Sequence, residues 1–336
     1  MPISFPLSVL DLSPVAAAST PSQAILDSVA LARLCDNLGY TRYWVAEHHN
    51  MPNIATSAPE VLIAHIAAVT TRIRVGAGGI MLPNHNPLRV VEIFRTLEVL
   101  YPGRIDLGLG RAPGTDPIAA VALRRGAPPD DPNERLAELI AFEGGSFPES
   151  HPFRAIVPMP SDVRLPPIWM LGSTLAGASI AASLGVRYAF AGHFAMRHAR
   201  AAIAWYRDQF KPSAQLAQPY AALAVTVVCG EDDQHAQRIA APIRLAVVRN
   251  RTGRRAPIAD VEDALAYRFS AEEQAIADEF LMGAIIGGPG RVVDGLERLA
   301  AGTHADELML SGLIGDRDER RRSYERVAAA AALTTV

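Results

Sequence analysis

Lysine and cysteine are the two residue types that this 336-residue chain almost lacks. Its only lysine, Lys211, comes just before Pro212, past the end of an expected helix, whereas Schiff-base enzymes need a desolvated lysine. Its two cysteines, Cys35 and Cys229, are far apart, which argues against a disulfide framework and against a cysteine-rich metal site. We therefore expect a reduced protein whose chemistry depends on neither residue type.

Long apolar runs and an excess of positive charge are missing as well. No apolar run reaches the roughly 18 residues of a membrane span, and the first residues show neither the charged leader nor the cleavage pattern of a signal peptide. The formal net charge is −3, so no basic surface indicates binding to nucleic acid. These absences predict a cytoplasmic protein with no membrane partner and no nucleic-acid partner.

What the sequence does contain is a regular alternation of apolar strands and amphipathic helices. We predict strands at 3–12, 41–47, 73–81, 104–110, 166–171, 187–192, 220–229 and 306–312. Strands that alternate with helices indicate a parallel sheet, and eight is the number that closes a (β/α)8 TIM barrel. We predict this α/β fold as one domain over residues 1–336, with a doubly wound open sheet as the alternative.

Two further features concern helix starts and one irregular segment. Capping boxes, Thr20 with Gln23 and Ser57 with Glu60, predict the starts of two helices. Residues 250–288 fit no strand–helix unit, are polar and end in "GGPG". We predict that they form an extra segment above the barrel, with the role of a lid.

Polar residues gather at the predicted strand ends, where the active site of such a barrel lies. The second strand runs into Glu47, His48 and His49. Because neighbouring strand residues point to opposite sides, one histidine should face the pocket and the other the surrounding loops. The other strand ends bring Gly78, Gly79, Met81, Gly110, Arg111, Gly172, Ser173, Thr174 and His193 to the same mouth.

Two of these groups predict a ligand with an anionic part and a flat part. Arg111 can bind a phosphate through its guanidinium, and Ser173 and Thr174 begin a helix whose N-terminus attracts anions. Glycines such as Gly78 and Gly79 weaken a strand unless its backbone must approach a ligand closely, as a flat aromatic ring would require. "GLGRAPG" is not a dinucleotide fingerprint, because its glycine spacing is off by one.

A metal-dependent hydrolase is a further alternative, with His48, His49, His85 and His193 as ligands. The chain lacks the H-x-H and H-E-x-x-H spacings of such sites, and Glu47 is the sole carboxylate at a strand end. We therefore expect no metal.

Several stretches together resemble the bacterial luciferase-like monooxygenase superfamily. They are "YWVAEHHN", "VGAGGIMLPNHNPLRVVE", "YPGRIDLGLGRAPGTD", "WMLGST" and "THADELML", in matching order over nearly the whole chain. The likeness is closest to short, single-chain members of unknown substrate. At Gly110 this chain departs from luciferase, whose α-subunit has a reactive cysteine there, so nothing supports light emission.

The resemblance implies a TIM barrel that binds reduced FMN, supplied by a separate flavin reductase. It also implies that O2 adds to the flavin as a C4a-hydroperoxide and oxygenates a small organic substrate. Family members are commonly homodimers that associate through helices beside the second and third strands. Two alternatives stay open: hydride transfer with the deazaflavin F420, and a non-catalytic barrel that only binds flavin.

The same resemblance assigns roles to residues. His48 is expected to handle protons with a pKa near 6.5, with His49 and Glu47 as its catalytic neighbours. The Gly78–Gly79 bond matches a non-prolyl cis peptide under the flavin ring. Predicted cofactor contacts are Gly78, Gly79, Met81, Gly110, Arg111, Leu171, Gly172, Ser173 and Thr174, with Arg135 as a second phosphate ligand. Leu10, Phe190, His193 and the 250–288 segment are expected to face the substrate.

Overall fold

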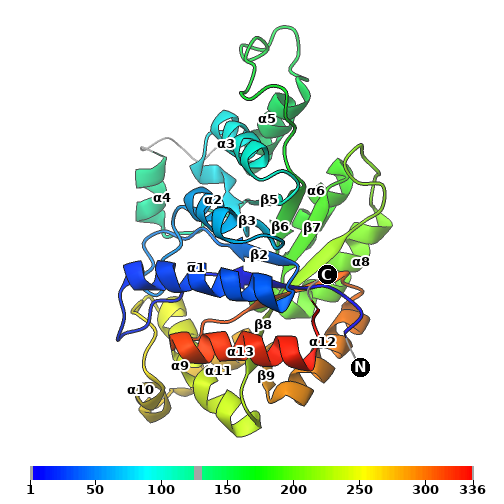
Figure 1. The fold of residues 1–336 in the computed structure, drawn as a ribbon. Coiled ribbons are helices and arrows are strands. Elements are labelled where there is room, and N and C mark those ends of the chain that lie inside the picture. The colour runs from blue at the N-terminus through cyan, green and yellow to red at the C-terminus, as the bar shows by residue number, and fades with distance from the viewer. Residues whose placement is uncertain (1–2, 125–130, 335–336) are drawn as a thin grey trace.

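In the computed structural model, which describes residues 3–124 and 131–334, eight parallel strands close into a barrel (Figure 1). They are β1 (Leu7–Asp11), β2 (Arg42–Val45), β3 (Arg74–Ala77), β5 (Ile105–Gly110), β6 (Ile168–Gly172), β7 (Arg187–Ala191), β8 (Ala221–Cys229) and β10 (Glu307–Ser311). Closure comes from β10, which pairs with both β1 and β8. The predicted TIM barrel is confirmed, and the open-sheet alternative is wrong.

Helices surround the barrel and give it a second, outer layer (Figure 1). The longer ones are α1 (Pro21–Leu38), α2 (Pro59–Val69), α3 (Pro87–Leu100), α5 (Pro132–Gly144), α6 (Leu175–Leu184), α8 (Ala199–Asp208), α9 (Asp233–Arg251), α12 (Pro289–Thr303) and α13 (Arg317–Ala330). Shorter elements are α4 (Pro117–Leu123), α7 (Gly192–Ala195), and the 3-10 turns Leu82–Asn84 and Met196–His198. Both chain ends lie close together, because the Ile3 amide donates to the Ala331 carbonyl.

The helix starts show one correct prediction and one error. The Thr20 side chain accepts a hydrogen bond from the Gln23 amide and caps α1, as predicted. The predicted cap at Ser57 is wrong, since α2 begins at Pro59 after Ala58, without a side-chain cap. The ring of Pro59 fixes its φ at a helical value in the first helical position, which leaves Ser57 too far upstream to cap.

The end of the barrel at which the strands begin is filled by a buried cluster of charges. Asp106 accepts hydrogen bonds from Arg42 (2.8 Å) and Arg74 (2.7 Å), and Glu307 accepts from Arg42 (2.9 Å) and from the Tyr220 hydroxyl (2.8 Å). Burial alone would raise the pKa of Asp106, but the two guanidinium groups outweigh it and lower that pKa. The charged groups of this cluster are thus bound to one another.

The predicted extra segment near residues 250–288 is present, and it consists of two helices and one short strand. After α9 come α10 (Val261–Ala266) and α11 (Ala271–Leu281), which pack against α9. The short strand β9 (Ile285–Gly287) then pairs with β8 outside the barrel. Phe280 of α11 lines a cavity together with His48, so this segment forms part of the wall of that cavity, and its role as a lid stays a prediction.

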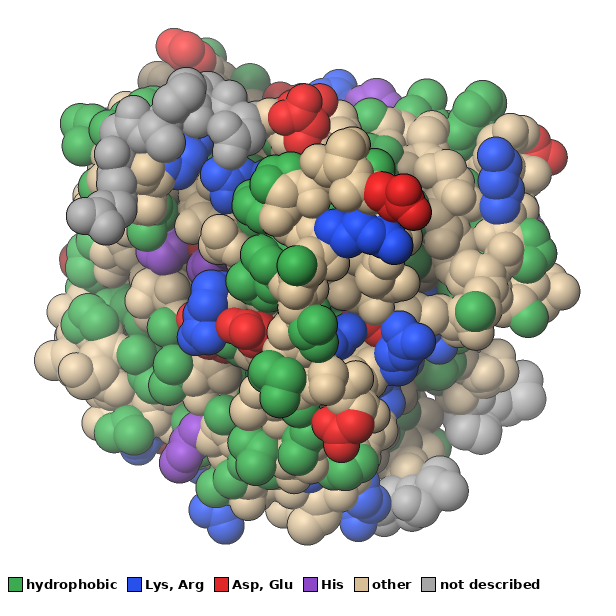
Figure 2. Space-filling model, turned by 90° about the horizontal axis from the view of Figure 1, so that it is seen from above, with side chains coloured by type: hydrophobic (Ala, Val, Ile, Leu, Met, Phe, Trp, Pro, Cys, Tyr) green, Lys and Arg blue, Asp and Glu red, His purple; other side chains and the backbone are tan. Residues whose placement is uncertain are grey.

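The outer surface carries charges of both signs. In the view of Figure 2, acidic and basic side chains are scattered among hydrophobic ones, and neither sign dominates that face. Within the described residues, no helix combines the length and the apolar character needed to cross a membrane.

Candidate active site

A cavity of about 460 Å³ opens at the mouth of the barrel, and we call it the mouth cavity. It is lined by Leu10, Leu12, Trp44, Ala46, His48, Gly78, Met81, Gly110, Arg111, Ala112, Pro132, Leu171, Gly172, Ser173, Thr174, Ala189, Phe190, Ala191, His193, Phe194, Ala224 and Met309. Its volume lies in the range of small-molecule and cofactor sites. The structure thus brings together every predicted site residue except Glu47, His49, Gly79 and Arg135.

Strand β2 and the residues after it explain which side chains reach this cavity. Trp44, Ala46 and His48 are two residues apart, so they point to the same side of the extended chain and line the cavity together. His49 points away, and its Nε2 donates a 2.9 Å hydrogen bond to the Glu47 carboxylate. The prediction that one histidine faces the pocket and the other the loops is confirmed.

The expected pKa of His48 is wrong. Burial lowers the pKa of His48 to about 4, although the Glu47 carboxylate partly opposes this shift. The cause is the low polarity around the ring, whose Nδ1 is buried without a hydrogen-bond partner. At neutral pH the imidazole is therefore uncharged, with one donor and one acceptor nitrogen.

Glu47 lies outside the cavity and binds the loops that form it. Its carboxylate accepts hydrogen bonds from the Met81 amide (2.7 Å) and the Asn84 side chain (3.1 Å), and it pairs with His49 and His85, each at 2.9 Å. Burial alone would raise the pKa of Glu47, but these hydrogen bonds, led by that from His85, lower it. We therefore assign Glu47 and His49 a positioning role rather than the predicted catalytic one.

The same network bears on the metal alternative. His49 and His85 both bind the Glu47 carboxylate, while His48 and His193 face the cavity. Throughout residues 3–124 and 131–334, no group of three or more His, Cys, Asp and Glu side chains is placed to hold a metal ion.

The Gly78–Gly79 peptide bond is cis and separates β3 from the two-residue strand β4 (Ile80–Met81). A Cβ atom on Gly78 would lie 2.6 Å from Leu10 Cδ1, and one on Gly79 would lie 2.8 Å from the Gly108 carbonyl oxygen. A side chain at position 79 would collide with backbone, whereas one at position 78 would meet the movable end of Leu10. Gly78 lines the cavity and Gly79 does not.

One end of the mouth cavity is suited to an anion. Arg111 lines it, and its buried Nε has no hydrogen-bond partner. Ser173 and Thr174 line it too, and Thr174 is the N-cap of α6 although its side chain makes no capping hydrogen bond. Arg135 lies elsewhere, where it donates to the His85 carbonyl at 2.6 Å.

His193 faces the cavity beside Phe194, with their ring centroids 4.1 Å apart. Burial, together with the nearby His48, lowers the pKa of His193 to about 4. Its Nδ1 is also buried without a partner. Two neutral imidazoles with unused nitrogen atoms therefore face the same space.

Comparison with known proteins identifies the family. The family model described as luciferase-like monooxygenase matches residues 5–302. The chain belongs to the luciferase-like monooxygenase family. A luciferase-like monooxygenase of Escherichia coli K12 is 40% identical over 320 residues, which cover 95% of this chain and 94% of that protein. The N-acetyl-S-alkylcysteine monooxygenase of Bacillus subtilis is 32% identical over 326 residues, which cover 95% of this chain and 96% of that protein.

Solved structures of this luciferase-like fold superimpose on the chain. The crystal structure of apo-MsnO8 has a TM-score of 0.86 at 37% identity and covers 98% of both chains. More distant structures share the fold alone. They include the oxygenating constituent of 3,6-diketocamphane monooxygenase in complex with FMN (TM-score 0.72, 17% identity, 99% of both chains) and an F420-dependent secondary alcohol dehydrogenase (TM-score 0.69, 13% identity, 98% of this chain and 99% of that one).

Several cavity residues were missed by the sequence analysis. Trp44 and Ala46 could have been found, because they alternate with His48 along one strand. Phe194 follows the predicted His193 directly. Asn250 and Arg251, which line an adjoining cavity, lie at the end of a helix, and no pattern in the sequence relates them to His48.

Proposed function

We propose that this luciferase-like protein is an FMN-dependent monooxygenase that uses O2 to oxygenate a small organic substrate. One observation carries the proposal: a single cavity is lined by Gly78, by Arg111 with Ser173 and Thr174, and by His48. When bound, reduced FMN supplies two electrons, so that one oxygen atom enters the substrate and the other leaves as water. The residues of this chain hold the cofactor, exclude water and exchange a proton.

The anionic end of the cavity suits the phosphate of FMN. Arg111 has an unused buried Nε, and charge-assisted hydrogen bonds from a guanidinium to a phosphate are among the strongest in proteins. The hydroxyls of Ser173 and Thr174 and the first amides of α6 add donors at a helix N-terminus.

The rest of the cavity suits a flat, largely apolar ring. Gly78 presents backbone, while Leu10, Trp44 and Phe190 add apolar surface. Trp44 is held by Trp169, with ring centroids 5.0 Å apart in an edge-on arrangement. Rigid apolar walls of this kind keep water away from a reactive centre.

We assign proton transfer to His48. A neutral imidazole carries one donor and one acceptor nitrogen, and burial keeps His48 neutral at pH 7 by lowering its pKa to about 4. The neutral ring can therefore accept a hydrogen bond at one nitrogen and donate one at the other, so that it can pass a proton at the edge of the flavin ring without being charged in the resting state. Glu47 acts through the loops and does not touch the cavity.

Two partners are part of the proposal. Electrons come from a separate flavin reductase, as the family resemblance implies. A second copy of the chain covers the face of α2 and α3, where Val61, Val99 and Leu100 are 63%, 48% and 58% exposed. We expect a homodimer by sedimentation velocity, and Leu100→Glu should shift it to the monomer.

The cofactor is tested by anaerobic titration with reduced FMN and, separately, with reduced F420. Each mixture is then exposed to O2. We expect saturable binding of reduced FMN, at least tenfold tighter than that of reduced F420, and O2 uptake by the complex that differs in rate from that of free reduced FMN. Preference for F420 without O2 uptake would instead indicate hydride transfer. Reoxidation at the rate of free FMN would indicate a barrel that only binds flavin.

A further inference from the structure

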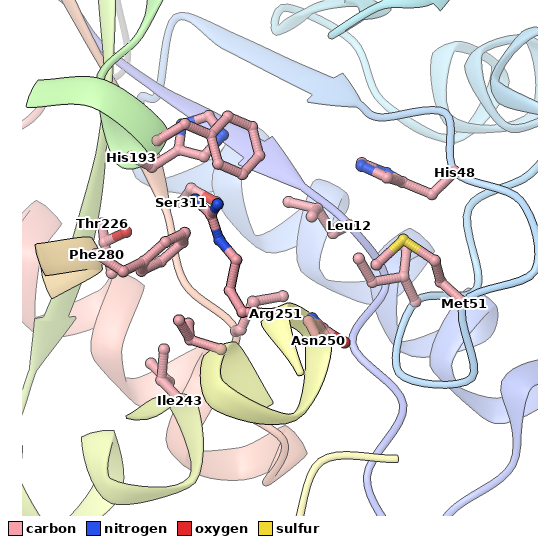
Figure 3. A pocket seen from close by; sticks show the side chains of 14 residues that line it. Leu12, His48, Met51, His193, Thr226, Ile243, Asn250, Arg251, Phe280 and Ser311 are labelled. Atoms are coloured by element: carbon pink, nitrogen blue, oxygen red, sulfur yellow. The ribbon is translucent and has the colours of Figure 1, made fainter. Parts of the chain in front are cut away.

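A second cavity of about 150 Å³ adjoins the mouth cavity, and we call it the side cavity (Figure 3). Both cavities are lined by Leu12, His48, His193 and Phe194, so they meet at the two neutral histidines. A cavity of this volume holds a group about the size of benzene. A molecule in the side cavity therefore lies beside the position that we assign to the reactive edge of the flavin.

Most of the side cavity is apolar. Its remaining lining residues are Met51, Ile54, Thr226, Ile243, Val247, Asn250, Arg251, Phe280, Ser311 and Leu313. None of these lining residues is an Asp or a Glu, and Arg251 is the one side chain among them that is charged at pH 7. The cavity thus combines apolar walls with a single positive charge.

Arg251 has no hydrogen bond or ion pair with any described residue, and neither has Arg249, whereas the next two arginines along the chain are paired. Arg254 pairs with Glu273, and Arg255 pairs with Asp116 at 3.4 Å. In Figure 3 the Arg251 side chain extends from the end of α9 toward Ser311, into the cavity. Arg251 is exposed to solvent as a whole residue, and it lines the apolar cavity with no carboxylate beside it, so its guanidinium is suited to a bound anion at the rim of the cavity.

Hydroxyl groups in the same cavity can bind the charged end of such a ligand. Ser311 and Thr226 line the side cavity, and their hydroxyls can donate hydrogen bonds to an anion. Asn250, the neighbour of Arg251, has a buried side-chain oxygen without a hydrogen-bond partner. That oxygen is an acceptor, so it suits a water molecule or a donor group rather than the anion itself.

We propose that the substrate is a small monocarboxylate with an apolar chain or ring, and that Arg251 determines this preference; this inference rests on the proposed function. The planar guanidinium matches a carboxylate in shape and charge. One arginine neutralises one negative charge, and a dianion such as a phosphate would keep an uncompensated charge next to apolar walls. The apolar part then lies between Ile243, Val247 and Phe280 and reaches toward His48.

Isothermal titration calorimetry with hexanoate, hexan-1-ol and hexylamine at pH 7 tests this proposal without any turnover. The protein is used both free of flavin and loaded with FMN. We expect hexanoate to bind at least tenfold more tightly than hexan-1-ol, and hexylamine to bind most weakly. Arg251→Gln should weaken hexanoate binding at least tenfold and leave hexan-1-ol unchanged, while Arg251→Lys should retain part of the preference.

The matched control is Arg249→Gln, which removes the same charge from the same helix but does not line the cavity. Equal affinities for hexanoate and hexan-1-ol, no binding of hexanoate, or equal effects of Arg249→Gln and Arg251→Gln would each overturn the proposal. Circular dichroism of each variant verifies that it is folded. Because hexanoate binding is measured without flavin, failure here is distinguishable from failure to bind FMN.

Discussion

The Glu47 carboxylate accepts a 2.7 Å hydrogen bond from the backbone amide of Met81. This bond joins the residues after β2 to those after the Gly78–Gly79 cis bond, 34 positions along the chain. His85 holds the other side of the same loop through the same oxygen atom, at 2.9 Å. Glu47 does not line the mouth cavity, but it holds the loop that carries Met81, which does.

Glu47→Gln should lower both stability and cofactor affinity. The amide keeps the shape but loses the charge that His85 and the Met81 amide bind, and buried hydrogen bonds to charged groups contribute about 1.5–3 kcal/mol. We expect a loss of this size in urea unfolding. Glu92→Gln is the control, since its partial ion pair with Arg89 lies on the surface and contributes about 0–1 kcal/mol. Equal effects of the two substitutions would contradict the role of Glu47.

His48→Gln should leave FMN binding nearly unchanged while product formation falls by about 10²–10⁴-fold, the usual contribution of a general acid or base. The measurement is a flavin titration paired with turnover under the same conditions. His198→Gln is the control, because His198 is exposed and lines neither cavity. Turnover that survives in His48→Gln would remove this side chain from the mechanism.

Stability should fall as the pH is lowered from about 6.5 toward 4. An unfolded histidine titrates near 6.5, whereas the pKa of His48 and that of His193 are each about 4 in the folded protein. Between these values the unfolded chain binds more protons, so stability rises with pH. The double variant His48→Gln, His193→Gln should flatten this slope in thermal melts at several pH values. An unchanged slope would show that these rings are not buried in the neutral form.

His85 should make the stability fall as the pH rises, which is opposite to the effect of His48 and His193. Burial alone would lower the pKa of His85, but its hydrogen bond to Glu47 and that charge outweigh burial and raise it above 6.5. The stabilisation is thus fully present below pH 6.5 and is lost as the pH rises through the raised pKa. His85→Gln should remove this loss of stability on the alkaline side, and melts from pH 6 to 9 measure it.

Arg111→Gln should weaken binding of FMN about 10–100-fold and change riboflavin binding little. The expected loss corresponds to about 1.5–3 kcal/mol for a hydrogen bond to a charged group, and riboflavin lacks the phosphate. Fluorescence titration with both flavins measures the difference. Arg89→Gln, on the surface of α3, is the control. Equal losses for FMN and riboflavin would place the phosphate elsewhere.

Much of the architecture could be read from the sequence, because strand and helix periodicities are local. All eight barrel strands lie where the pattern places them, and the glycines at 78 and 79 mark the break between β3 and β4. The errors arise where distant parts meet. Residues 285–287 pair with β8, and no local pattern in a polar segment indicates such a partner.

For the site, residue types were easier to predict than their roles. That His48, Arg111 and Ser173 converge follows from the position of strand ends in a barrel. The neutral state of His48 depends on burial by residues far away in the chain, such as those of α9 and α11. The role of Glu47 depends on partners more than 30 positions away, which the sequence "EHH" alone cannot specify.

The most direct test of the central claim is a crystal structure of this protein with FMN bound. Our account predicts the isoalloxazine ring against Gly78, the phosphate on Arg111, Ser173 and Thr174, and His48 beside the ring edge that adjoins the side cavity. A flavin bound in any other cavity, or one whose phosphate contacts none of these three residues, would contradict the account.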